Sequence, residues 1–130
     1  MGAQVLLAPV PCIHLESATK VGPRVAFGTN RLGLSQTPIG LPVFIYASRP
    51  PHPLFRPGVF SWTGKLGAIE KAVERGPRSG KHPDPSVRPP TAEAGDTACI
   101  EFWEVLDLIK LEKDRPFHDF LTLSGAKPFR

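Results

Sequence analysis

Eight of the sixteen Lys and Arg residues fall in one stretch, residues 49–88, which holds only three Asp or Glu. That stretch carries a net charge of +5, whereas residues 89–130 carry −3 and residues 1–48 carry +2. A concentrated basic segment attracts a phosphate-bearing partner and makes binding sensitive to salt. An ordinary solvated surface can show the same asymmetry, so charge alone leaves both interpretations open.

One short motif in the sequence resembles a pair of metal ligands. Cys12 and His14 are separated by a single residue, and His82 and Asp84 flank a proline. A structural zinc site needs four ligands, and no second pair stands at a suitable spacing. We therefore predict no metal and no other cofactor.

Catalytic motifs are missing from the sequence. It contains no G-x-S-x-G elbow, no phosphate-binding P-loop and no G-x-G-x-x-G fingerprint. Glu101 and Glu104 are three residues apart and would point to opposite faces of a strand, so they cannot act as paired carboxylates. The prediction leans toward a protein that binds without catalysis.

The elements that position these residues are predicted to be mostly β. The 130 residues suffice for one domain, and 41% of them are hydrophobic. The chain also has 16 Pro and 12 Gly, which interrupt helices and favour short strands joined by turns. We predict a single domain over residues 1–130, mostly β (α+β), with short peripheral helices.

Four stretches are predicted strands. Residues 41–48 form a continuous β-branched and aromatic run, typical of a strand buried on both faces. Residues 4–10 are apolar and bounded by prolines, and residues 12–15 alternate and could continue that strand. Residues 99–105 also alternate. Residues 59–73 predict a long strand that bends or bulges at its glycines.

The remaining segments are predicted loops and short helical turns. Residues 49–57 and 76–90 are proline-rich loops, and residues 24–36 fit either a short strand or one or two helical turns. Asp114 could cap a short helix that starts near Pro116. Its buried face would hold Phe117, Phe120 and Leu121.

The cellular location is predicted from the ends and the cysteines. No basic region precedes the N-terminal apolar stretch, which Pro9 and Pro11 interrupt, so a signal peptide is not expected. The apolar runs are too short to span a bilayer. Cys12 and Cys99 do not make a disulfide framework, and we expect a cytoplasmic protein with reduced thiols. The oligomeric state stays open.

Three ordered motifs resemble the EVE domain, a member of the PUA-like superfamily with the YTH and ASCH domains. Residues 40–48 (GLPVFIYAS) look like its strand of the form G-D-x-hydrophobic-F-Y-H-S. Gly64 followed by residues 82–85 (HPDP) is similar to its strand and Y-P-D-P/T turn. Residues 102–117 resemble its strand-to-helix passage. Pro42 replaces the family's acidic residue, an aromatic-rich first strand and early Trp are missing, and the final strand of the PUA-like barrel has no evident residues.

EVE and YTH domains read modified bases, so the resemblance implies a pocket for a flipped or unpaired base of DNA or RNA. Trp103 alternates with apolar neighbours, which favours the core. Trp62 lies beside small polar residues near the basic loops and could be either a stacking face or core. The resemblance implies base contacts from Trp62, Tyr46, Ser48, Asn30 and Asp84, and phosphate contacts from Arg49, Arg56, Lys65, Arg78, Lys81 and Arg88.

Two other functions stay open. ASCH-type relatives resemble small ribonucleases or amidohydrolases that use a lysine, for which Lys20 and Lys65 are candidates. The pattern G-x-K-x-x-E-x-R of those relatives is absent, so solvated surface lysines explain the residues equally well. Residues 76–90 could instead be a basic arm of a protein-interaction module that meets an acidic partner.

Overall fold

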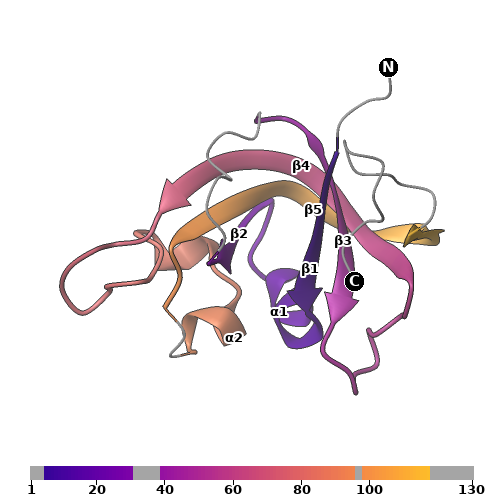
Figure 1. Cartoon of the computed structure of the whole chain (residues 1–130), viewed down its shortest axis with the longest axis horizontal. Helices are drawn as coiled ribbons and strands as arrows, with labels where there is room; N and C mark the ends of the chain where they lie inside the picture. The colour runs from indigo at the N-terminus through magenta and orange to yellow at the C-terminus, as the bar shows by residue number, and fades with distance from the viewer. Residues whose placement is uncertain (1–4, 31–38, 96–97, 118–130) are drawn as a thin grey trace.

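The computed structural model describes residues 5–30, 39–95 and 98–117. Its elements in chain order are five strands, two short α-helices and one 3₁₀ turn (Figure 1). They are β1 (Leu6–Pro11), α1 (Cys12–Ala18), β2 (Arg24–Thr29), β3 (Pro42–Ser48), β4 (Val59–Lys71), η2 (Pro85–Val87), α2 (Pro90–Glu93) and β5 (Glu101–Pro116). The prediction of a mostly β chain is confirmed.

The five strands form one mixed sheet in the order β1-β3-β4-β5-β2. β1 runs parallel to β3, and the other neighbouring pairs are antiparallel. β4 and β5 arch together across the molecule, and α1 and α2 lie on the concave side of this arch (Figure 1). β1 and β2 are therefore the two outer strands of a strongly curved sheet.

The curvature comes from irregular pairing between the two long strands. The register between β4 and β5 shifts at three places, between Phe60 and Trp62, Thr63 and Lys65, and Leu66 and Ile69. Such irregularities bend a strand and increase its twist. The predicted long strand with a bend or bulge is confirmed.

The main core lies between the sheet and α1. Val43 and Ile45 of β3 are fully buried, as their continuous apolar run predicts. Leu15 of α1 packs into the same cluster with Val25 of β2 and Val105 of β5. A second cluster of Leu7, Tyr46 and Phe60 is covered by Phe44 and Phe117. These two clusters fix the curvature that brings β1, β2 and α1 together.

Residues 12–15 do not continue the first strand as predicted. They begin α1, directly after Pro11. Cys12, Leu15 and Ala18 are buried at intervals of three residues, which is the spacing of one helix face. Four alternating residues were too few to distinguish a strand from a helix.

The predicted helix near Asp114 is also wrong. β5 continues to Pro116 and pairs with the start of β4, where Val59 lies opposite Pro116 and Phe60 opposite Arg115. Pro116 is the last residue of the strand, where the missing N–H is tolerated. Phe117 packs on the second cluster, whereas Phe120 and Leu121 lie outside the described residues.

The ambiguous segment 24–36 begins as strand β2, and residues 31–38 lie outside the described part of the chain. Residues 49–57 form the predicted loop, and η2 interrupts the loop over 76–90. Within the described ranges, no helix has the length and apolar character needed to cross a membrane.

Candidate functional site

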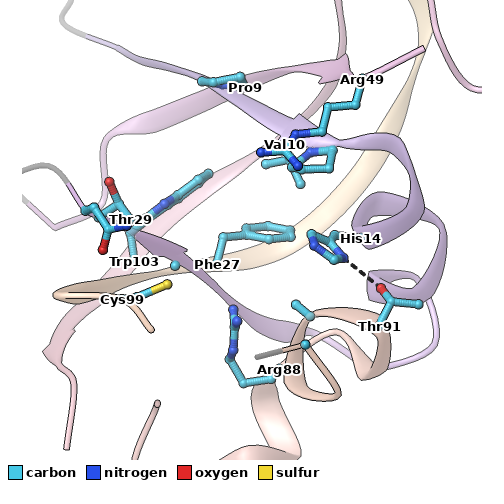
Figure 2. Close-up of a pocket in the computed structure, with 15 residues that line it drawn as sticks. Pro9, Val10, His14, Phe27, Thr29, Arg49, Arg88, Thr91, Cys99 and Trp103 are labelled. Carbon is cyan, nitrogen blue, oxygen red and sulfur yellow. Dashed lines mark hydrogen bonds between the residues drawn. The ribbon is translucent and has the colours of Figure 1, made fainter. Parts of the chain in front are cut away.

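A pocket of about 270 Å³ lies between the two outer strands of the sheet. The C-terminal end of β1 forms one side of it with Pro9, Val10 and Pro11, and β2 forms the other with Phe27, Gly28 and Thr29. Thr91 and Ala92 of α2 also line the pocket, together with His14 of α1 (Figure 2). Segments distant in the sequence therefore build one concave surface.

The apolar wall of the pocket is an aromatic pair. Phe27 and Trp103 lie opposite each other in the β2–β5 ladder, with ring centroids 5.1 Å apart. Each is 4% exposed, so the rings belong to the core and present only part of their surface to the pocket. Packing on both sides holds this wall rigid.

Gly28 keeps the space beside that wall open. A Cβ placed there would lie 2.5 Å from Sγ of Cys99, which also lines the pocket. Only a residue without a side chain fits between β2 and Cys99 as they stand.

The side of the pocket formed by the helices is polar. Nδ1 of His14 and Oγ1 of Thr91 are 2.8 Å apart, and the Ser17 hydroxyl lies 2.8 Å from the same oxygen. The Thr91 hydroxyl also donates to the carbonyl oxygen of Ile13 at 3.2 Å. This network orients the His14 ring toward the pocket (Figure 2). Burial lowers the pKa of His14, and the charges of Arg88 and Arg49 lower it further.

Arg88 supplies a buried cation to the pocket. Its residue is 7% exposed, Nη1 donates to the carbonyl oxygen of Ala26 at 2.8 Å, and Cζ lies 4.7 Å from the centre of the Phe102 ring. Nε and Oε2 of Glu93 are 4.0 Å apart, too far for a hydrogen bond. Burial lowers the pKa of Arg88, and the nearby Glu93 carboxylate partly offsets that effect.

Arg49, the residue directly after β3, supplies a second cation to the pocket. It follows β3 with φ of 65°, a left-handed conformation unusual for a residue with a side chain, and it is exposed. In Figure 2 its guanidinium lies beside Val10, and that of Arg88 points in from the other side of Phe27. The fifteen lining residues include no Asp or Glu, so the pocket is electropositive.

Three of the sequence-predicted site residues meet at this pocket, namely Asn30, Arg49 and Arg88. Ser48 ends β3, half-buried, opposite Pro11 of β1. The structure therefore brings together one of the predicted base-binding residues and two of the predicted phosphate-binding residues.

Both predicted stacking rings lie elsewhere. Trp62 is 5% exposed and packs in the main core, and Tyr46 is 8% exposed in the second cluster. β4 is buried on both faces here, since Phe60, Ser61 and Trp62 are all inaccessible. Neither Trp62 nor Tyr46 is among the residues that line this pocket, so these two rings do not form its walls.

Asp84 is a capping residue and does not line the pocket. Its carboxylate accepts from the backbone N–H of Ser86 at 3.0 Å and from the Ser86 hydroxyl at 2.6 Å, at the start of η2. These bonds lower the pKa of Asp84. Its turn-forming role explains the residue without a ligand.

Several predicted phosphate ligands are engaged within the protein. Arg78 donates to Glu93 and to the carbonyl oxygen of His82, and Lys81 donates to backbone carbonyl oxygens of Glu93 and Gly95. Arg56 donates to two carbonyl oxygens of its own loop. Lys65 is exposed on β4.

The lysines proposed for hydrolysis are also outside the pocket. Lys20 and Lys65 are both exposed, and neither is among the lining residues. Among the residues that the structure describes, no three His, Cys, Asp or Glu side chains gather as a metal site would require.

Sequence reasoning missed Phe27 and Thr91, and it considered His14 only as a metal ligand. The one local signal is the apolar run of residues 25–27, in which Phe27 precedes a glycine. Comparisons with protein-family models, with curated proteins and with solved structures found no match to this chain.

Proposed function

We propose that this chain is a nucleic-acid-binding module whose pocket between β1 and β2 accepts one unpaired or flipped base of DNA or RNA. One observation carries the proposal: a cavity of about 270 Å³ combines an aromatic wall with two arginines, and none of its described lining residues is Asp or Glu. Small-molecule pockets start at roughly 300 Å³, so the cavity suits one compact group. Aromatic packing plus guanidinium contacts are the chemistry that unpaired nucleotides require.

Each part of the pocket has a role in this proposal. The accessible parts of Phe27 and Trp103 pack against the base. Asn30 and Thr29, at the end of β2, offer hydrogen bonds to its edge. Arg49 is exposed at the other side and contacts the backbone phosphate of the same nucleotide.

We further propose that this module is PUA-like. Its curved mixed sheet leaves β1 and β2 as outer strands, with α1 on the concave side (Figure 1). In the proposal the sheet is the wall of a small PUA-like barrel, and the gap between β1 and β2 is its mouth. Residues 118–130 lie outside the described part of the chain.

A salt series with single-stranded and fully paired oligonucleotides tests the proposed function. We expect the single strand to bind more tightly, because a paired base must first leave its stack. Its affinity should fall steeply with salt, and Arg49→Ala should reduce the slope of log K against log salt by about 0.7, the effect of one lost phosphate contact.

The matched control is Arg75→Ala, which removes the same charge from an exposed residue that does not line the pocket. It should leave the slope nearly unchanged. Equal slopes for both variants, or affinity for the single strand that does not respond to salt, would contradict the proposal.

A further inference from the structure

We propose that the ligand group held in this pocket carries a negative charge on oxygen, bound between Arg88 and Arg49. The group is either a terminal phosphate monoester of the nucleic acid or a carboxylate attached to a base. The inference deepens the proposed function and rests on it for the nucleotide part of the ligand. It adds that the pocket binds a neutral base less tightly than a negatively charged group.

The first observation is the incomplete pairing of Arg88. A buried guanidinium is costly unless hydrogen bonds and a counter-charge compensate it. Here Nη1 has the Ala26 carbonyl, whereas Nε makes no hydrogen bond within the described residues. Arg88 is 93% buried and also lines the pocket, so an anion in the cavity would add counter-charge to this guanidinium.

The nearest carboxylate, that of Glu93, compensates the charge of Arg88 only in part. Glu93 gives Oε1 to Arg78, and its Oε2 stays 4.0 Å from Nε of Arg88. Nζ of Lys81 donates to the backbone carbonyl oxygen of Glu93. The charges of Arg78, Lys81 and Arg88 together lower the pKa of the Glu93 carboxyl. The carboxylate of Glu93 is therefore shared among three cations.

The second observation is that the other charged groups at the pocket have the same sign. Arg49 and Arg88 both act on His14, each lowering its pKa, so their fields overlap at the ring. Among the described residues that line the cavity, none is Asp or Glu. An anion placed here would relieve repulsion between cations and would accept charge-assisted hydrogen bonds.

The size of the pocket limits what the anion can be attached to. About 270 Å³ admits a single nucleotide-sized group and excludes a long chain. The aromatic wall then faces the apolar part of that group, and the guanidinium groups face its oxygens. A phosphate at a chain end and a carboxylate on a base both fit this description.

The test compares four fluorescent single strands of one sequence by anisotropy at constant ionic strength: 5′-hydroxyl, 5′-phosphate, an internal carboxylated pyrimidine, and the unmodified pyrimidine. We expect one acidic strand to bind about tenfold more tightly than its neutral counterpart, the effect of one charge-assisted hydrogen bond. Which strand gains identifies the source of the anion.

Three variants assign the preference to the pocket. Arg49→Gln and Arg88→Lys should each remove most of it, because Gln lacks the charge and Lys lacks the planar fork. Arg75→Gln should keep it. If Arg88→Lys fails to fold, the exposed Arg49 decides the question alone.

The outcomes separate this inference from the proposed function. Equal, salt-sensitive binding of all four strands overturns the anion site and leaves the nucleic-acid module standing. If no strand binds, but a nucleoside 5′-monophosphate raises the melting temperature of the wild type and not of Arg49→Gln, the anion site stands and the proposed function fails. No binding of any of these ligands overturns both.

Discussion

The indole of Trp62 shows how a single residue can suggest a site and serve the core instead. Its neighbours Ser61, Thr63 and Gly64 are the small polar residues expected around an exposed ring. In the structure Trp62 contributes to the same cluster as Val43 and Trp103. The aromatic wall of the pocket comes from Phe27 and Trp103, on other strands.

Substitutions of Trp62 distinguish the two roles. Trp62→Phe should fold and bind oligonucleotides like the wild type, since the ring does not line the pocket. Trp62→Ala should lower the free energy of unfolding by about 3–5 kcal/mol through the cavity it leaves. Urea denaturation and anisotropy on the same samples check this. A folded Trp62→Phe protein that cannot bind would restore Trp62 to the site.

Among the elements, the pair β4 and β5 decides the shape of the molecule. β4 has 13 residues and β5 has 16, long enough that straight strands would project beyond the core. Their three register shifts bend them over α1 and α2. The pocket exists because this bend brings the ends of β1 and β2 together with α1 and α2, which line it jointly.

Gly64 is the position where this bend tolerates no side chain. A Cβ there would lie 2.4 Å from Cγ1 of Val105 and 2.8 Å from the carbonyl oxygen of Leu106. Because one of the two atoms belongs to the backbone, the strands themselves would have to separate. We expect Gly64→Ala to cost about 1–3 kcal/mol of stability, measured by urea denaturation.

A second glycine of β4, Gly67, provides the matched control for that experiment. A Cβ at Gly67 would come no closer than 3.3 Å to its neighbours, so Gly67→Ala on the same strand should be milder. Equal stability of Gly64→Ala and the wild type would show that the two strands do not approach as closely as described.

At the scale of the whole molecule, a polar cluster around the buried residues Glu104 and His82 joins the loop after β4 to β2 and β5. Glu104 binds Arg24 through two hydrogen bonds of 2.7 and 2.8 Å, and Nε2 of His82 lies 3.7 Å from Oε2 of the same carboxylate. Nδ1 of His82 accepts from the backbone N–H of Asp84 at 2.8 Å. The ring of His82 packs edge-on against Phe102.

This cluster predicts a pH dependence of stability. Burial lowers the pKa of His82, and the charge of Arg88 lowers it further, although Glu104 and Glu70 act in the opposite direction. The unfolded chain, with an ordinary histidine pKa near 6.5, therefore binds more protons than the folded one as the pH falls below that value. Stability is complete above about pH 6.5 and is lost as the pH falls toward the lower, folded-state pKa.

The measurement is the free energy of unfolding in urea at pH 7.5 and 5.5. The wild type should be less stable at pH 5.5, and His82→Asn should show a smaller difference, because its amide oxygen can replace Nδ1 as acceptor without titrating. His14, whose pKa is also lowered, leaves a residual slope. An unchanged pH dependence in His82→Asn would contradict this role.

The sequence by itself determined that the chain is mostly β and where several of its strands are interrupted or bent. Proline and glycine ruled out long helices, the apolar run of residues 41–48 predicted a buried strand, and the glycines of residues 59–73 predicted a bent one. These features are local, because they depend on the backbone conformations each residue allows. The sequence also showed that basic charge is concentrated in residues 49–88, but it did not show what that charge binds.

Only the tertiary structure decided which residues form the site. Whether Trp62 faces a core or a cavity depends on what packs on each face of β4, and whether Arg78 is available depends on Glu93, fifteen residues away in the chain. Asn30, Arg49 and Arg88 meet because a curved sheet brings the ends of β2 and β3 near α2. Such proximity is a property of strand pairing over long separations, which no local pattern encodes.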